Sequence, residues 1–205
     1  MHVEALTQQA SSLIPGFAKF GGFTLVGGTA LALQIGHRLS IDFDFFSEKD
    51  LPKNLLQKVK RAFPEHSISV TYRALEQLNL LIGGVKTTFF QYPYSFLDSS
   101  REYEGVNVAS IREIAAMKAF ALGKRLSYKD YVDWYFMLKE KHVDLEDTIT
   151  FCARKFGNDF NDRLFLGQLV SIEDVLDQKI DFLRDDVGRE EITQFLTKTV
   201  RDFKL

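Results

Sequence analysis

The stretch FTLVGGTALALQIGHRLSIDFDFF, at residues 23–46, decides the fold of this chain. The apolar run at 23–26 favours a strand, and the Gly-Gly-Thr at 27–29 interrupts it directly before alanines and leucines that favour a helix. The aromatic run at 42–46 predicts another strand. Residues 23–46 therefore predict a strand, a glycine turn, a short helix, a basic loop and a second strand.

Two aspartates of the second strand, Asp42 and Asp44, are separated by a single residue. Because a strand alternates its faces, both carboxylates point the same way, with Cα atoms roughly 6.6 Å apart. At an effective dielectric of 20 they would repel by about 2.5 kcal/mol. A divalent cation would turn that repulsion into coordination, and oxygen ligands of this kind suit Mg²⁺, or Mn²⁺. We expect a metal site here; an exposed pair of acids at a strand edge is the alternative.

The glycine turn predicts a site for anions. Gly27 and Gly28 would let a ligand approach the backbone closely, and the N-terminus of the following helix offers free N–H groups and a positive dipole end to a triphosphate. The hydroxyl of Thr29 would be the N-cap or a phosphate donor. An ordinary strand-to-helix turn is the alternative for the glycines alone. Together with the aspartates one helix later, the turn favours a nucleotide site.

Three blocks of this stretch, GGTALAL, GHRLS and DFDFF, occur in order within one short window. They resemble the signature of the AbiEii/AbiGii-type nucleotidyltransferase toxins, in the DNA polymerase β-like nucleotidyltransferase superfamily. The resemblance implies an α+β protein: a minimal nucleotidyltransferase fold, with a mixed, mostly antiparallel sheet and flanking helices, plus a C-terminal helical domain. It implies an NTP substrate, Mg²⁺, and a bacterial toxin–antitoxin or abortive-infection pair with a cognate antitoxin. It also suggests a tRNA 3′ end as the acceptor.

The resemblance implies roles for further residues. In the loop before the aspartates, Arg38 and Ser40 would reach a phosphate or orient Asp42, whereas His37 has no second ligand at metal spacing and is expected to be structural. A lysine at the position of Lys118 contacts the nucleotide phosphates in this family. A snorkelling surface lysine is the alternative for that residue.

The segment that begins at Arg125 resembles the family's R…KD..D run. Its two acids, Asp130 and Asp133, fall one turn apart on a predicted helix. We expect one of them to lock Lys118 or Arg125 in a salt bridge while the other faces the cleft, and we choose Asp130 for the cleft. Acids on the surface of the helix near its N-terminus are the alternative.

One position departs from the family pattern. Members of the family commonly place a third acid in the segment that corresponds to residues 85–94, and the matching position here is Thr88. A hydroxyl is a weaker Mg²⁺ ligand and a poorer general base than a carboxylate. This difference predicts an effect on the rate of catalysis more than on nucleotide binding.

The remaining elements are predicted from periodicity. Residues 2–14 predict a helix ended by Pro15-Gly16, and residues 52–63 predict a helix with four basic side chains, either a solvated face or an RNA-facing patch. An antiparallel meander is predicted at 67–73, 77–82 and 85–92. Ser110 and Glu113 predict a capping box. Helices are predicted from there to the end of the chain, including 144–156, 159–169, 171–183 and 188–203.

Composition limits the classes of protein. With 205 residues, 45% of them hydrophobic and nineteen Phe, the chain can bury one sizeable core or two small ones. We expect a nucleotidyltransferase core domain at 1–109 and a helical domain at 110–205, with the nucleotide between them. The net charge of −2 requires a local basic patch for any nucleic-acid contact. The lone Cys152 is expected to be a core residue of a cytoplasmic protein without a membrane segment.

The sequence therefore favours a Mg²⁺-dependent nucleotidyltransferase. A transferase that modifies a protein or a small molecule is an alternative within the same class. The alternative from another class is a catalytically impaired nucleotide-binding or partner-binding module, which kept the glycines and the aspartates but lost turnover with the acid at Thr88.

Overall fold

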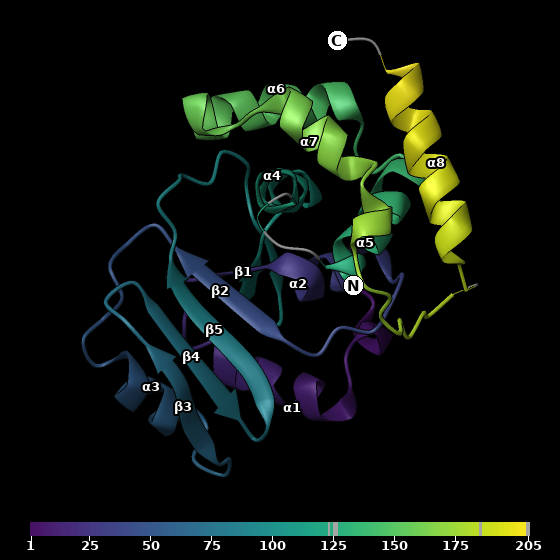
Figure 1. Ribbon diagram of the computed structural model, residues 1–205. Coiled ribbons are helices and arrows are strands. Elements are labelled where there is room, and N and C mark those ends of the chain that lie inside the picture. The colour runs from purple at the N-terminus through teal and green to yellow at the C-terminus, as the bar shows by residue number, and fades with distance from the viewer. Residues whose placement is uncertain (123, 125–126, 185, 204–205) are drawn as a thin grey trace.

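A computed structural model describes residues 1–122, 124, 127–184 and 186–203. Figure 1 shows strands β2 to β5 side by side, with α1 and α3 against one side of them and α4 to α8 grouped on the other side of the molecule. The helices are α1 Gln8–Phe17, α2 Gly27–Ile35, α3 Leu55–Ala62, α4 Ile111–Ala121, α5 Tyr128–Lys139, α6 Leu145–Phe156, α7 Asp162–Leu169 and α8 Arg189–Asp202. The strands are β1 Thr24–Val26, β2 Phe43–Ser47, β3 Ile68–Arg73, β4 Gln77–Ile82, β5 Val85–Gln91, β6 Arg101–Tyr103 and β7 Val106–Val108.

The described strands form one sheet in the order β3-β4-β5-β2-β1-β7-β6. Two pairs are parallel, β2 with β5 and β1 with β7, and the other pairs are antiparallel. The predicted α+β class and the mixed, mostly antiparallel sheet are thus confirmed, as is the antiparallel meander that extends the aspartate strand.

The alternation of β2 separates the core from the cleft. Phe43 and Phe45 are buried, and their rings lie 4.8 and 4.6 Å from that of Phe17 on α1. Asp44 and Phe46, on the opposite face, are half-buried. Because successive side chains of a strand alternate, the phenylalanines that anchor β2 also hold Asp44 toward the other face.

Two short strands were absent from the expected elements. Strands β6 and β7 pair through Glu104 and Gly105, which both have positive φ. Val106 and Val108 of β7 are buried. Three-residue strands give too few alternations for a pattern to stand out, which is why the periodicity did not reveal them.

Two predicted helices were placed wrongly. The opening segment forms a 3₁₀ turn at Val3–Ala5 and then α1, which runs through Pro15 instead of ending there. The predicted helix 171–183 is a 3₁₀ turn at Ile172–Asp174 followed by extended chain. This extended chain crosses the basic loop: Leu39 N–H donates to the Asp181 carbonyl at 2.8 Å, and Leu183 N–H donates to the His37 carbonyl at 3.2 Å.

The capping box of α4 is half formed. The Ser110 hydroxyl accepts from Glu113 N–H at 3.2 Å, as predicted. The Glu113 carboxylate does not return to the cap; it accepts from the backbone of Leu97 and Asp98 and pairs with Lys155 at 2.7 Å. Tertiary partners outcompete the local one because this carboxylate is fully buried and needs several donors.

A continuous hydrophobic core joins the sheet region and the helices that follow residue 109. The division into domains 1–109 and 110–205 stays a prediction. Within the described residues, no helix is both long and apolar enough to cross a membrane. Cys152 is buried, and burial raises the pKa of its thiol to about 12, so it stays protonated at neutral pH.

Candidate functional site

A polar cleft of about 330 Å³ lies where the start of α2, the loop before β2, α4 and the start of α5 meet. Most of the residues predicted for the site line it together. The lining residues are Gly28, Thr29, Arg38, Ser40, Ile41, Asp42, Asp44, Lys118, Ser127, Lys129 and Asp130. Of the other predicted residues, Gly27, Thr88 and Asp133 lie outside this lining, and Arg125 lies outside the described residues.

Packing alone requires glycine at positions 27 and 28, apart from any role in binding. Gly27 has φ +72°, and a Cβ there would lie 2.8 Å from Asp44 Oδ2. A Cβ on Gly28 would lie 2.6 Å from Arg38 Nη2. Both contacts are closer than side chains tolerate, so the glycines let Asp44 and Arg38 reach the start of α2.

Thr29 is not the N-cap of α2. The cap residue is Val26, which provides no side-chain hydrogen bond to the helix. The buried Thr29 hydroxyl instead donates to the Asp42 carbonyl and lies 2.8 Å from Ser40 Oγ. Thr29 therefore positions the loop that leads into Asp42, and the first N–H groups of α2 have no side-chain cap.

A buried ion cluster lies directly behind the cleft, with Asp133 at its centre. Arg38 donates from Nε and Nη2 to the two Asp133 oxygens at 2.7 and 3.0 Å. Lys118 Nζ lies 2.6 Å from Asp133 Oδ2 and 2.7 Å from Asp130 Oδ1. These four side chains are at most 4% exposed, and their two positive and two negative charges balance.

The charges of the cluster fix one another. Burial raises the pKa of Asp133, but the adjacent Arg38 and Lys118 outweigh burial and hold that pKa well below its usual value. Burial lowers the pKa of Lys118, but Asp133 and Asp130 outweigh it and leave this pKa raised. Both groups are therefore charged at neutral pH.

His37 completes the cluster as a neutral side chain. Burial lowers its pKa, although Asp133 acts in the opposite direction. Its Nε2 lies 2.7 Å from Asp133 Oδ1. Since an ionised carboxylate only accepts, Nε2 must carry the proton and donate. This leaves Nδ1 as a buried acceptor without a hydrogen-bond partner among the described residues. His37 supports Asp133, consistent with the structural role expected for it.

The two acids of α5 lie where the sequence predicted them, one in a salt bridge and one at the cleft. Their roles in catalysis stay predictions. Asp133 locks Lys118 in a salt bridge, and Asp130 lines the cleft while also contacting Lys118. The alternative of exposed helix acids is wrong, because both are buried. The alternative of a snorkelling surface lysine is wrong for Lys118 for the same reason.

Thr88 lies directly beside Asp44. The parallel pairing of β2 and β5 places the two residues in register, with Thr88 half-buried. A third acid at this position would join the aspartate pair across neighbouring strands. Here the neighbour of Asp44 is a hydroxyl. The position where the family commonly has a third carboxylate therefore lies beside Asp44, as the sequence predicted, and carries Thr88 instead.

The donors in the cleft fit a hard divalent cation. Asp42 and Asp44 both line it, half-buried, and carboxylate oxygens are the ligands that Mg²⁺ prefers. In the part of the chain that the structure describes, no three His, Cys, Asp or Glu side chains gather as a complete metal site. A cation held by two carboxylates would need substrate oxygens or water as further ligands, as is usual for Mg²⁺.

Three lining residues were missed at the level of sequence. Ser127 and Lys129 flank the start of α5, and the exposed Ile41 immediately precedes Asp42. Among the described residues Lys129 has no ion-pair partner, whereas Lys118 has two. The only indication in the sequence was the position of Lys129 next to Asp130. By pattern alone, a lysine that lines a cleft at the start of a helix cannot be told from an ordinary surface lysine.

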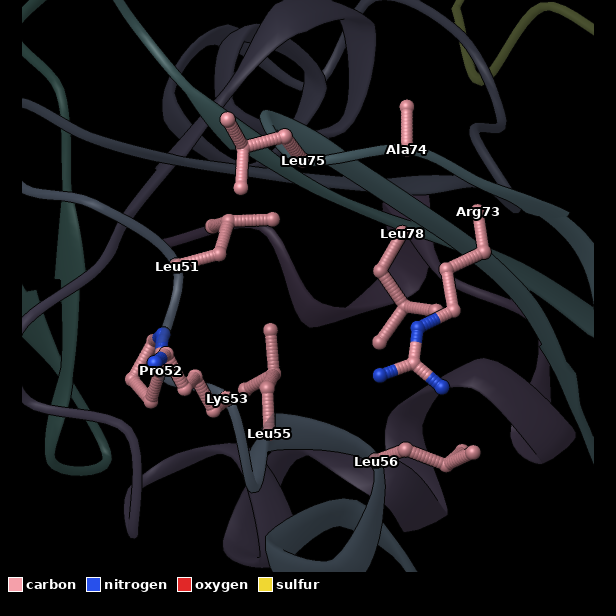
Figure 2. Close-up of a pocket in the computed structure, with 9 residues that line it drawn as sticks. All are labelled: Leu51, Pro52, Lys53, Leu55, Leu56, Arg73, Ala74, Leu75 and Leu78. Atoms are coloured by element: carbon pink, nitrogen blue, oxygen red, sulfur yellow. The ribbon is translucent and has the colours of Figure 1, made fainter.

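A second pocket, of about 320 Å³, lies away from the cleft and shares no residue with it. Figure 2 shows leucines from the start of α3 and from β4 around it, with Arg73 reaching along one side. It contains no carboxylate, so it lacks the groups that the cleft chemistry needs. It is lined by Leu51, Pro52, Lys53, Leu55, Leu56, Arg73, Ala74, Leu75 and Leu78.

The family model for nucleotidyl transferase AbiEii toxins of type IV toxin–antitoxin systems matches residues 14–104 and 89–205. An uncharacterized protein of Aquifex aeolicus (strain VF5) is 30% identical over 184 residues, which cover 88% of this chain and 87% of that protein.

Two crystal structures of Helicobacter pylori proteins share the fold. One, a candidate nucleotidyltransferase, superimposes with a TM-score of 0.65 and 22% identity, covering 95% of this chain and 94% of the other. The second, JHP933, gives a TM-score of 0.56 and 18% identity, covering 96% and 97%.

Proposed function

Because the chain belongs to the AbiEii family of nucleotidyltransferase toxins of type IV toxin–antitoxin systems, we propose that it transfers NMP from an NTP to an acceptor hydroxyl. The cofactor is Mg²⁺ or Mn²⁺, and the acceptor is a tRNA 3′ end. In this role the chain is the toxin of a pair with a cognate antitoxin and works in the cytoplasm, where its substrates are.

The observation that carries this proposal is the composition of the cleft. One cavity brings together the uncapped start of α2, a pair of carboxylates and two lysines. The first N–H groups of α2 bind the phosphates of the NTP, and Gly28 lets them approach. The domains proposed at 1–109 and 110–205 each contribute one wall.

Lysines neutralise the triphosphate from the helical side. Lys118 has three N–H bonds, two of which serve Asp130 and Asp133. The third is the donor that we assign to a phosphate oxygen. Lys129, exposed at the mouth of the cleft, adds a second positive charge. Charge stabilisation of this kind is the main contribution that a protein makes to phosphoryl transfer.

Asp42 and Asp44 would hold the divalent cation, which when bound supplies positive charge to the phosphates. In the transfer, the acceptor oxygen forms a bond to the α-phosphorus, the bond from that phosphorus to the bridging oxygen breaks, and pyrophosphate leaves in line. The acceptor proton passes to a carboxylate of the cleft or to water. Arg38 keeps the loop before Asp42 in place through Asp133.

The test is transfer of label from each α-labelled NTP, with Mg²⁺, onto total tRNA, onto the protein itself and onto a small-molecule extract. The Asp42→Asn/Asp44→Asn double variant removes the carboxylates, and Glu65→Gln, an exposed acid outside the cleft, controls for loss of charge. We expect labelled tRNA with the wild type and Glu65→Gln, and none with the double variant. Label on tRNA that persists in the double variant would contradict the proposal.

A second candidate function follows from Thr88, which lies in register with Asp44. Without a third carboxylate, the chain would bind nucleotide with Mg²⁺ yet transfer nothing, as a sensing or partner-binding module. Binding of a non-hydrolysable NTP analogue without transfer to any acceptor favours this function. Thr88→Asp separates the two: a gain in the transfer rate indicates an enzyme limited at this position, and no gain rules out that limit.

A further inference from the structure

Residues paired across neighbouring strands form a row of side chains that leads away from the cleft. Asp44 on β2 lies opposite Thr88 on β5, Thr88 opposite Asn79 on β4, and Asn79 opposite Tyr72 on β3. Because residues opposite each other on paired strands share a face, all four point to the side that Asp44 faces. The row therefore runs from the candidate metal ligands to the edge strand of the sheet.

A second row flanks the first. Phe46 and Phe90 are opposite each other on the same face, with ring centroids 5.1 Å apart in an edge contact. Lys86, two residues before Thr88 on β5, shares this face and is exposed. We call Tyr72, Asn79, Lys86, Thr88 and Phe90 the β5–β3 face.

The β5–β3 face differs from the opposite face of the same strands. The opposite face buries Phe43, Phe45 and Phe89 against α1. On the β5–β3 face, Tyr72 is 51% exposed, Lys86 is exposed, and Asn79, Thr88 and Phe90 are half-buried. This face thus presents rings, an amide and a cation beside the cleft.

The direction of the reaction places the acceptor on this side. In the sheet, β1 and the α2 that follows it lie on one side of β2, and β5 lies on the other. The phosphates bind at the start of α2, so the pyrophosphate leaves on that side. Attacking and leaving oxygens are roughly in line in phosphoryl transfer. With the phosphates at the start of α2, an acceptor hydroxyl in line with the leaving pyrophosphate would approach from the β5 side.

The side chains of this face suit a single-stranded nucleic acid. The exposed ring of Tyr72 and the partly exposed ring of Phe90 offer surfaces on which bases stack. Gln77 Nε2 donates to Asn79 Oδ1 at 2.9 Å, so the Asn79 oxygen is engaged and its NH₂ group is the donor that a base edge would use. Lys86 supplies a cation for a backbone phosphate.

We propose that the β5–β3 face is the acceptor-binding surface, and that its ligand is the single-stranded 3′ end of an RNA. This proposal rests on the proposed function, because it takes the phosphate side of the cleft from it. Tyr72 and Phe90 stack bases, Asn79 contacts a base edge, Lys86 pairs with a phosphate, and Thr88 lies beside the reacting hydroxyl.

The experiment compares Tyr72→Ala, Tyr72→Phe and Lys86→Glu with Lys19→Glu, an exposed lysine after α1 that controls for charge reversal. Transfer kinetics give KM for RNA and KM for NTP separately, and circular dichroism checks that each variant is folded. We expect Tyr72→Ala and Lys86→Glu to raise KM for RNA roughly tenfold and to leave KM for NTP unchanged. Tyr72→Phe, which keeps the ring, and Lys19→Glu should behave as wild type.

An RNA-binding measurement on a variant that cannot catalyse transfer tests this inference independently of the proposed function. Fluorescence anisotropy of a labelled short RNA with a single-stranded 3′ end is measured on the Asp42→Asn/Asp44→Asn protein, with and without Tyr72→Ala. A roughly tenfold loss of affinity on Tyr72→Ala supports the surface even where no transfer occurs. Unchanged affinity and unchanged KM for RNA overturn it, as does label that appears only on a protein or a small molecule.

Discussion

Two pairs of aspartates meet at the cleft in opposite environments. Asp42, in the loop just before β2, and Asp44, in the strand itself, are half-buried and line the cavity. Asp130 and Asp133, on α5, are buried, and Asp133 alone meets two nitrogens of Arg38, the Lys118 ammonium and the His37 ring. The helix pair has its charge neutralised by the protein itself. Asp42 and Asp44 instead line the cavity in which we propose that a cation and a substrate bind.

This difference separates two supporting acids from two acids that we propose as metal ligands. Removing a support should destabilise the fold, whereas removing a proposed ligand should lower the rate of transfer. Each of the following experiments tests this separation.

The largest expected effect is on turnover. Asp44→Asn should lower the rate of nucleotidyl transfer roughly a thousandfold, because one charged oxygen ligand is lost where transition-state charge develops. The free energy of unfolding should change by less than it does for Asp133→Asn. Initial rates with labelled NTP and urea unfolding of the same preparation measure both quantities. A rate loss that is matched by unfolding would remove the distinction between the pairs.

The next effect is on stability. Asp133→Asn should lower the free energy of unfolding by about 3–5 kcal/mol, because Arg38 and Lys118 would be left buried with one charge too few. Urea denaturation at neutral pH measures it. Glu65→Gln, an exposed acid, should change the same quantity by no more than about 0.5 kcal/mol. Equal effects of the two variants would show that the cluster does not support the fold.

A smaller effect tests whether Asp133, through Arg38, stabilises the start of α2 at the cleft. Gly28→Ala should cost about 1–3 kcal/mol of stability, since its Cβ would meet Arg38 Nη2 at 2.6 Å and Arg38 is held in place by Asp133. Gly22→Ala, which meets nothing within 4 Å, is the matched control. In an Asp133→Asn background Arg38 can move, so the cost of Gly28→Ala should shrink. Simple additivity in this double-mutant cycle would argue against the coupling.

The smallest effect is a pH dependence. The pKa of His37 is lowered in the folded protein, so below about pH 6.5 the unfolded chain binds a proton that the folded chain does not. The free energy of unfolding should therefore fall by at most about 1 kcal/mol between pH 6.5 and 5.5 from this group. His37→Gln should lose that part of the slope in urea titrations at several pH values. An unchanged slope would mean that His37 is not held neutral.

Asp133 should also lower the free energy of unfolding as the pH falls, but at more acidic pH than His37. The pKa of Asp133 is lowered on folding, so its contribution to stability is present above its unfolded pKa and is lost as pH falls toward its folded pKa. Acid unfolding should set in below about pH 4, the usual range of an aspartate. The Asp133→Asn variant, already without this contribution, should show a weaker dependence there.

Local patterns predicted much of the fold. The strands at 68–73, 77–82 and 85–91 lie within one residue of their predicted limits, because alternation over six or seven residues is a strong signal. The segment 172–183 shows where local pattern fails. Its apolar spacing fits a helix, yet its backbone pairs with the loop at 37–39, a partner more than a hundred residues away.

The candidate site divides in the same way. The spacing predicted Asp42 and Asp44 on one strand face, but β2 begins at Phe43, so Asp42 lies in the loop before the strand and still lines the same cleft as Asp44. The start of α2 lies beside them, as the glycine turn indicated. The structure brings these groups into one cleft, while their roles in catalysis and binding stay predictions. Thr29, predicted as a cap or a phosphate donor, turned out to bond the Asp42 carbonyl, because that contact depends on how the loop folds back.

The sequence by itself determined the family and the strand and helix types around residues 23–46, because these depend on neighbours a few residues apart. Only the tertiary structure decided that Asp133 binds Arg38, 95 residues away, that Gly28 makes room for that arginine, and that Tyr72 joins the row of Asp44. Such contacts follow from how the sheet and the helices pack, and burial then makes their charges and hydrogen bonds depend on one another.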